Sequence, residues 1–213
     1  MKEIRLREVV PEVFARLDCN SEVWLKQLSF LSGKKYLLEA VSGAGKSSLC
    51  SYIYGYRHDY RGNITFDEKD IRDYQANDWS ELRKTALSIL FQELRLFQEL
   101  SVWENLLIKN RLTGFKSEKW IRNSLERLGI EEKAGQMVGK LSFGQQQRVA
   151  VIRALCQPFR FLLLDEPVSH LDEENNRIVG ELIREEADSQ EAGIVVTSIG
   201  KKLELSYDKI LHL

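Results

Sequence analysis

Short apolar runs alternate along the chain with stretches in which apolar residues recur at helical spacing. The runs have the length of strands and predict strands at residues 35–41, 62–66, 86–91, 161–165, 193–198 and 208–213. The helically spaced stretches predict helices at residues 46–54, 116–128, 145–156 and 172–187. Strands and helices alternate towards both ends of the chain, whereas the middle is mainly helical. This order predicts an α/β fold with a mainly parallel sheet and an inserted α-helical subdomain.

Two predicted helices begin at capping boxes, in which a polar residue and an acidic residue three positions later satisfy free backbone N–H groups. Ser101 and Glu104 form one such pair, and Asp78 and Glu81 form another that opens a short helix. The helix at 116–128 gathers four apolar side chains on one face: Trp120, Ile121, Leu125 and Leu128.

The chain is expected to form one domain, since a domain takes about 150 residues and the chain has 213. Residues 1–92 and 158–213 are predicted to form a core lobe, and residues 93–157 a helical lobe. No apolar run approaches the ~18 residues that a membrane span requires. The charged start at residues 1–5 lacks the apolar stretch of a signal peptide. The chain is therefore expected to cross no membrane.

Composition narrows the classes of protein further. The chain has 31 Lys and Arg against 32 Asp and Glu, a formal net charge of −1, and 43% of its residues are hydrophobic. These values exclude a disordered chain, and the balanced charge gives no global basic field for nucleic acid. Cys19, Cys50 and Cys156 are widely spaced without a CxxC pair, which favours reduced thiols.

Candidate chemistry begins at a glycine-rich segment between a predicted strand and a predicted helix. The segment consists of Ser42, Gly43, Ala44, Gly45, Lys46, Ser47 and Ser48. Glycines let backbone N–H groups face an anion, and the N-terminus of the helix adds a favourable dipole. Lys46 would contact the β- and γ-phosphates of a nucleotide, and Ser47 would ligate Mg²⁺. The alternative is a turn that binds nothing, but the strand–loop–helix context favours phosphate binding.

Two carboxylates end a later apolar strand. Asp165 and Glu166 follow the apolar residues 161–164, and adjacent strand residues point to opposite sides, which predicts separate roles for them. Asp165 suits the shell of Mg²⁺, and Glu166 suits the base that polarises an attacking water. An ordinary strand end is the alternative, which the following Pro167 and residues 169–172 weaken.

The polar segment before the helix at 145–156 allows two interpretations. Ser142 and Gly144 precede the helix, and a hydroxyl beside free N–H groups at a helix N-terminus can bind an anion. Ser142 can instead be an ordinary N-cap, with Gln145 at the capping-box position. Both interpretations stay open on local grounds.

Together these segments resemble the nucleotide-binding subunit of ATP-binding cassette (ABC) proteins. Residues 42–48 (SGAGKSS) resemble the Walker A motif, and residues 161–167 (FLLLDEP) resemble Walker B. Residues 141–155 (LSFGQQQRVAVIRAL) resemble the family signature and its helix, and residues 169–172 (SHLD) resemble the D-loop. Gln92 falls where the glutamine of the Q-loop is expected. The motifs are in the family's order, and the resemblance covers essentially the whole chain.

The resemblance implies a P-loop NTPase core with N-terminal antiparallel strands and a head-to-tail dimer that holds two ATP molecules between its subunits. Ser142, Gly144 and Gln145 of one subunit would contact the γ-phosphate that Walker A of the other subunit holds. Gln92 would contact Mg²⁺ or the attacking water. ATP would close the dimer, either with a second copy or with another ABC subunit, and hydrolysis would open it.

The resemblance also implies a partner and a location. The chain would be a cytoplasmic ATPase at the inner face of the cell membrane, where the Gln92 loop relays the nucleotide state to an integral membrane permease on a separate chain. The segment after Gln92 is most similar to small ABC ATPases of lipoprotein release, macrolide-type efflux and cell division. Leu94, Leu96 and Phe97 favour a docking groove for a coupling helix of that permease. Packing within the helical lobe is the alternative.

Three residues depart from the family pattern. Ala40 stands in place of a Walker A glycine, which adds about 1 kcal/mol of strain if its φ is positive. Phe143 replaces the first glycine of the signature pair. Ser198 stands in place of the switch histidine as a candidate catalytic residue: its hydroxyl can donate one hydrogen bond there, but it is shorter than histidine and cannot become cationic. Losing one such contact costs about 3 kcal/mol, roughly a hundredfold in rate, so we expect a slow ATPase that binds ATP well.

The adenine platform and the class of function each have alternatives. Phe14 lies near the position of the aromatic residue that stacks on adenine in the family, with Trp24 as competitor and a core role for Phe14 equally open. A hydrolysis-deficient, nucleotide-gated interaction module is the second function, which Ser198 favours and Glu166 opposes. A soluble ABC ATPase acting on nucleic acid is the third, which the single cassette and the isolated basic pairs oppose.

Overall fold

Two sheets organise the computed structural model, which describes residues 1–15 and 21–213 of the chain. The larger sheet is parallel, with the order β6 (Leu87–Leu90), β7 (Phe161–Asp165), β8 (Gly193–Ser198), β3 (Lys35–Glu39) and β9 (Lys209–His212). The smaller sheet is antiparallel, with the order β2 (Gln27–Leu31), β1 (Glu3–Pro11), β4 (Tyr60–Phe66) and β5 (Lys69–Asp70). The predicted parallel sheet with N-terminal antiparallel strands is confirmed.

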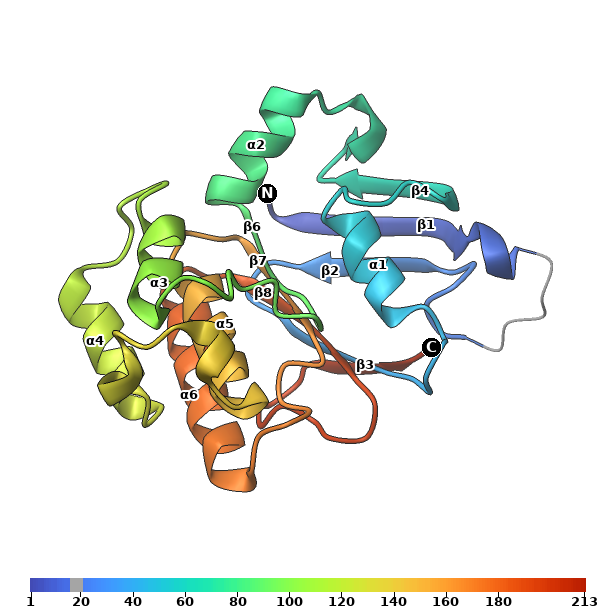
Figure 1. Cartoon of the computed structure of the whole chain (residues 1–213). Coiled ribbons are helices and arrows are strands. Elements are labelled where there is room, and N and C mark those ends of the chain that lie inside the picture. Colours follow the sequence, from blue (N-terminus) through green and yellow to red (C-terminus); the bar gives the residue numbers. More distant parts are fainter. Residues whose placement is uncertain (16–20) are drawn as a thin grey trace.

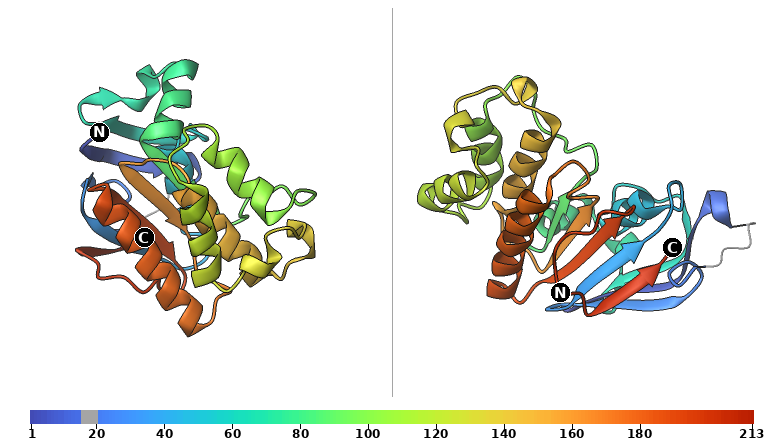
Figure 2. Two further views of the ribbon diagram at one scale, coloured as in Figure 1. Left: turned by 90° about the vertical axis from the view of Figure 1, so that its left-hand side faces the viewer. Right: turned by 90° about the horizontal axis from the view of Figure 1, so that it is seen from below.

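Helices fill the connections between the strands. They are α1 (Lys46–Ile53), α2 (Ala76–Thr85), α3 (Val102–Asn110), α4 (Glu118–Arg127), α5 (Phe143–Leu155) and α6 (Glu173–Ser189). Short 3-10 turns lie at residues 12–14, 71–73, 131–133 and 138–140. Figure 1 shows α3 to α6 gathered at one side of the molecule and the smaller sheet at the other. The right-hand view of Figure 2 shows the same separation.

The larger sheet lies between two hydrophobic cores, and β7 shows why. Its run of apolar residues puts Leu162 and Leu164 into a core shared with α3 to α6. Phe161 and Leu163 belong to a second core, shared with α1 and the smaller sheet. Successive side chains of a strand point to opposite faces, so a strand that is covered on both faces needs a continuous apolar run.

Two helices begin earlier than the sequence pattern predicts, since α5 starts at Phe143 and not at residue 145, and α2 starts before Asp78. α2 starts at Ala76, because the backbone N–H of Gln75 donates to the carboxylate of Asp78 at 2.9 Å. Asp78 is therefore the acidic partner in the first turn of α2 and not its N-cap. The predicted capping box of Ser101 and Glu104 at the start of α3 is confirmed.

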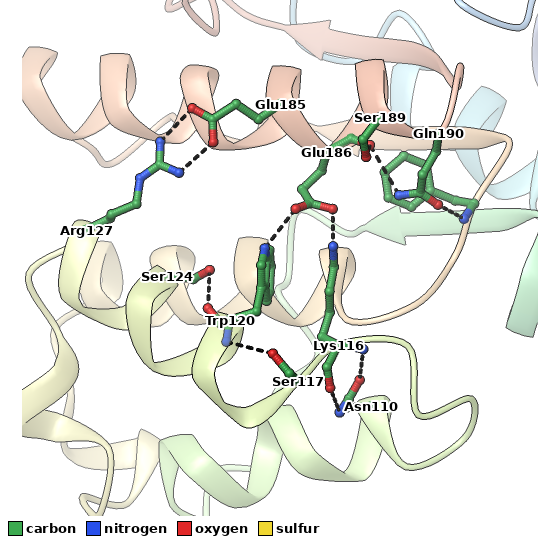
Figure 3. Close-up of polar contacts among 11 residues, drawn as sticks. Asn110, Lys116, Ser117, Trp120, Ser124, Arg127, Glu185, Glu186, Ser189 and Gln190 are labelled. Atoms are coloured by element: carbon green, nitrogen blue, oxygen red, sulfur yellow. Dashed lines mark hydrogen bonds and ion pairs between the residues drawn. The ribbon is translucent and has the colours of Figure 1, made fainter.

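The segment that contains α4 is tied to α6 by two neighbouring glutamates (Figure 3). Glu186 is buried and accepts hydrogen bonds from Nζ of Lys116 and, at 2.8 Å, from Nε1 of Trp120. Glu185 is half-exposed and accepts two hydrogen bonds from Arg127, at 2.6 and 3.0 Å. One buried and one half-exposed ion pair therefore hold the segment of α4 against α6.

Within the described residues, no helix has the length and apolar character that crossing a membrane requires. Cys50 and Cys156 are buried free thiols. Cys19 lies outside the described residues.

Candidate active site

The glycine-rich segment forms a loop between β3 and α1, and its glycines have the backbone conformation that this loop requires. Gly43 and Gly45 have φ values of 83° and 93°. A methyl group on Gly45 would lie 3.0 Å from Trp24 and 3.1 Å from Phe14, so that a side chain would clash as well as strain the backbone. Ala40 is not among the residues with positive φ, so the strain that a positive φ would cause there does not arise.

The two candidate aromatic residues take different positions beside this loop. Trp24 is 2% exposed, and its indole N–H donates to the carbonyl of Ala44 at 3.0 Å. It therefore supports the loop from beneath and presents no free face to a base. Phe14 is half-buried and borders Gly45, so it is the better placed of the two to contact a nucleotide.

Lys46 is the charged residue of this segment, and it is only 4% exposed. Its Nζ donates to the carbonyl of Val41 at 3.0 Å. Burial lowers the pKa of Lys46, whereas the charges of Glu166 and Asp165 act in the opposite direction. The amine is thus held at the centre of the loop, where a phosphate oxygen can replace the Val41 carbonyl as its partner.

A pocket of about 240 Å³ lies over the loop, and we call it the phosphate pocket. It is lined by Ser42, Gly43, Gly45, Lys46, Ser47, Ser48, Gln92, Glu166 and Ile199. The hydroxyl of Ser47 lies 3.5 Å from Oε1 of Gln92. The structure therefore brings Gln92 and Glu166 from distant parts of the sequence to the predicted loop.

The two carboxylates after β7 have different surroundings. Asp165 is 3% exposed and accepts a hydrogen bond from Oγ1 of Thr197 at 2.5 Å. Glu166 lines the phosphate pocket and has a φ of 50°, which costs on the order of 1–3 kcal/mol for a non-glycine residue. Burial, with the charge of Asp165, raises the pKa of Glu166, and Lys46 and His170 act in the opposite direction. Strained backbone and a raised carboxylate pKa are both typical of a catalytic position.

Oxygen donors at the phosphate pocket suit a hard cation. The Ser47 hydroxyl and the Gln92 carbonyl oxygen both line the pocket and lie 3.5 Å apart. Asp165 does not line the pocket, and its buried carboxylate accepts the hydrogen bond from Thr197. Mg²⁺ binds few protein groups directly and completes its shell with water and phosphate oxygens. Ser47 and Gln92 therefore fit Mg²⁺ held together with a nucleotide, and the predicted role of Asp165 would be exerted through water.

The start of α5 forms both a cap and a pocket. Ser142 caps α5: its Oγ accepts from the N–H of Gln145 at 3.3 Å, and its N–H donates to Gln145 Oε1 at 3.0 Å. A second pocket of about 400 Å³, the signature pocket, is lined by Ser142, Phe143, Gly144, Gln145, Arg148, His170 and the start of α6. The phosphate and signature pockets share no residue.

Ser198 does not line the phosphate pocket. It is 2% exposed, and its hydroxyl donates to the carbonyl of Lys201 at 2.6 Å. The next residue, Ile199, lines the pocket instead. The expectation that the Ser198 hydroxyl donates a hydrogen bond at the active site therefore does not match this geometry.

The apolar residues after Gln92 divide between the core and the surface. Leu94 and Leu96 are 2% and 8% exposed and belong to the core beside α3 to α6. Phe97 is 50% exposed. The docking groove predicted from all three is wrong for Leu94 and Leu96, which pack the helical segment, because burying them stabilises that segment more than surface exposure would.

Two polar residues of α5 that the sequence pattern did not single out contact the site's loops. The guanidinium of Arg153 donates to the carbonyls of Leu94 and Arg95 at 2.6 and 2.7 Å. Both of those residues have positive φ. Gln147 is buried and bonds the backbone of Glu166. Polar residues within the apolar stretch of α5 were the available sign, since a buried polar side chain needs a partner.

Comparison with known proteins agrees with this geometry. The ABC transporter family model matches residues 26–169, more than half of the chain. The ABC transporter ATP-binding protein YtrE of Bacillus subtilis is 33% identical over 161 residues, covering 74% of this chain and 70% of its own. The chain belongs to the ABC transporter family of ATPases. The prediction of that family from residues 42–48, 141–155 and 161–172 is confirmed.

Two further relatives differ in how much of their own length the match covers. An ABC transporter ATP-binding protein of Mycobacterium tuberculosis is 34% identical over 189 residues, and the match covers 87% of this chain but 57% of that protein. The chain thus spans just over half the length of that relative. The lipoprotein-releasing system ATP-binding protein LolD of Syntrophotalea carbinolica is 27% identical, covering 93% and 87% of the two chains, which agrees with the predicted type.

Solved structures share the fold of this cassette. The dimeric structure of MJ0796, a bacterial ABC transporter cassette, has a TM-score of 0.79 at 22% identity and covers 97% of this chain and 94% of that chain. A dimeric post-hydrolysis state of MJ0796, bound to ADP and Pi, has a TM-score of 0.76.

Proposed function

We propose that this chain binds ATP with Mg²⁺ and hydrolyses it to drive a separate membrane permease or mechanotransmission complex. One observation carries the proposal: the phosphate pocket joins the loop of Lys46 and Ser47 to Gln92 and Glu166. Backbone N–H groups and Lys46 would hold the phosphates, and Ser47, Gln92 and Asp165 would hold Mg²⁺ with water. The bound cation would neutralise charge on the phosphates during hydrolysis.

Glu166 is proposed to polarise the attacking water. Its raised pKa, caused mainly by burial, makes the ionised carboxylate a stronger base than an exposed glutamate. Gln92 lines the same pocket and would orient the same water. Phe14 at the edge of the loop is proposed to contact the adenine.

A second cassette is proposed to complete the site. Ser142, Gly144 and Gln145 line the signature pocket, which is separate from the phosphate pocket of the same chain. If the signature pocket of one subunit faced the ATP held by the other subunit, pockets from both subunits would contact one nucleotide. The solved relative MJ0796 is dimeric, which supports this arrangement. The partner is a second copy or another ABC subunit.

The membrane partner is proposed to be a permease on a separate chain, with this cassette lying peripherally at the cytoplasmic face. The likeness to LolD of a lipoprotein-releasing system supports a complex of that class. Phe97 is the exposed apolar residue of the segment after Gln92, and it is the proposed contact to the partner.

Nucleotide binding is tested by removing Lys46. In Lys46→Ala, both the affinity for a fluorescent ATP analogue and phosphate release should fall at least about tenfold, because a charge-assisted contact to phosphate is lost. Lys119→Ala is the matched control, since Lys119 is exposed on α4 and should behave as the wild type. An unchanged affinity in Lys46→Ala would show that the pocket does not bind the phosphates.

A hydrolysis-deficient, nucleotide-gated module is the second candidate function. One observation favours it: Ile199 lines the phosphate pocket while the Ser198 hydroxyl is bonded to Lys201. These positions of Ile199 and Ser198 equally support the leading proposal, in which the chain hydrolyses ATP slowly. The two candidates differ in whether phosphate release depends on Glu166.

A further inference from the structure

The backbone of Glu166 is held from two sides. Its N–H donates to the carbonyl of Thr197 on β8 at 3.2 Å. Its own carbonyl accepts a hydrogen bond from Nε2 of Gln147 on α5 at 3.0 Å. Because φ of Glu166 is 50°, a conformation that few non-glycine residues adopt, these neighbours are needed to keep it there.

Gln147 uses both ends of its amide on the turn that follows Glu166. Its Oε1 accepts the N–H of His170 at 3.2 Å, and its Nε2 lies 3.4 Å from the hydroxyl of Ser169. The residue is 1% exposed, so water cannot replace a partner that is lost. One amide therefore fixes both ends of the turn from Glu166 to His170.

Gln147 lies on the helix that forms the signature pocket. Ser142 caps this helix, and Gln147 follows within its first two turns. Gln147 itself lines neither the phosphate pocket nor the signature pocket. The side chain that holds the Glu166 backbone thus belongs to α5 and lies behind both pockets, bonded to one lining residue of each.

We propose that Gln147 is a positioning residue for ATP hydrolysis, which sets the direction of the Glu166 carboxylate through its bonds to Glu166 and His170. This inference rests on the proposed function, in which Glu166 polarises the attacking water. Losing Gln147 slows the chemical step, because a base displaced by about 1 Å costs up to about a hundredfold in rate. Nucleotide binding is retained, because Lys46 and its loop are untouched.

The test compares Gln147→Met with Gln146→Met in the full chain. Methionine has nearly the length of glutamine but lacks the amide. Gln146 is the next residue of α5, and its amide donates to the carbonyl of Leu141 at 3.1 Å. We expect kcat for phosphate release to fall about tenfold to a hundredfold in Gln147→Met, with KM and the Kd for a fluorescent ATP analogue unchanged. Gln146→Met should keep the kcat of the wild type.

A second variant covers the case in which Gln147→Met fails to fold. Gln147→Glu keeps an acceptor for the N–H of His170 and removes the donor to Glu166, so kcat should fall while binding persists. A kcat equal to that of the wild type in either folded variant would overturn the proposal. Parallel loss of binding and turnover in both variants would also overturn it, since Gln147 would then be structural.

A third variant distinguishes a structural or neutral Gln147 from a chain that does not use Glu166 for hydrolysis. Glu166→Gln, measured beside these variants, loses turnover if Glu166 is the base. If it keeps full turnover, the proposed function fails. If it loses turnover while both Gln147 variants keep theirs, only the role of Gln147 fails.

Discussion

At the residue scale, the end of β8 is one of the three places where the sequence departs from the family pattern that it resembles. Ser198 stands where the pattern has a histidine, and its hydroxyl is bonded to the carbonyl of Lys201. The neighbouring Ile199 is 44% exposed and lines the phosphate pocket. An aliphatic side chain supplies no charge or hydrogen bond, so in the proposed function Ile199 would not stabilise the γ-phosphate.

Ser198→His is therefore expected to speed the enzyme. Residue 198 directly precedes Ile199, which lines the pocket, and an imidazole is longer than the serine side chain. If the ring reaches the pocket, it supplies one donor near the developing charge and should raise phosphate release at saturating ATP about tenfold, less than the roughly hundredfold effect of one such contact. The affinity for an ATP analogue, measured beside it, checks that the more bulky ring leaves the loop of Lys46 intact. A variant that binds ATP normally and turns over at the rate of the wild type would contradict the slow-ATPase hypothesis.

At the element scale, what the sequence predicted depended on local patterns. β7 and β8 have the predicted bounds, because continuous apolar runs between polar residues mark buried strands. The left-handed backbone of Glu166, Leu94 and Arg95 could not be predicted, since no glycine marks these positions. It is imposed by contacts from α5, which lies far away in the sequence.

Burial could not be predicted for short loops either. Leu94 and Leu96 look like an exposed apolar patch in the sequence, but they lie in the core. An apolar residue in a loop has no periodicity that says which way it points. The burial of Glu186 within α6 could not be predicted for a different reason: it depends on the position of α4 against α6 (Figure 3).

Glu186 and Glu185 provide a matched test of how α4 is attached. In Glu186→Gln, the buried ammonium of Lys116 loses its counter-charge, which should lower the free energy of unfolding by about 3–5 kcal/mol. In Glu185→Gln, the half-exposed pair with Arg127 is lost, which should cost under about 1 kcal/mol. Urea denaturation measures both, and equal losses in the two variants would contradict the assigned burial.

At the scale of the whole molecule, the proposed site consists of two halves, the phosphate pocket and the signature pocket. The phosphate pocket and the signature pocket share no residue, yet Gln147 on the signature helix holds the backbone of Glu166. The sequence motifs identified both halves, but only the folded chain shows that one buried amide joins them. The division into a core lobe and a helical lobe at residues 93–157 stays a prediction.

Gly144→Asp tests whether the signature pocket serves a different nucleotide from the chain's own. A side chain at Gly144 would meet the carbonyl of His170 at 3.0 Å, and a carboxylate there would repel a phosphate. Turnover should fall at least about tenfold, as for a lost contact to the γ-phosphate. The affinity for an ATP analogue at the phosphate pocket should stay that of the wild type. Equal loss of affinity and turnover would contradict the separation of the two halves.

The most direct measurement is steady-state phosphate release by the purified chain and its Glu166→Gln variant, at saturating ATP and Mg²⁺. If Glu166 is the base of a true ATPase, the variant should bind the ATP analogue as the wild type does, and its turnover should be lower by about a hundredfold or more. Equal turnover in the two proteins would contradict the proposed hydrolysis and favour the nucleotide-gated module.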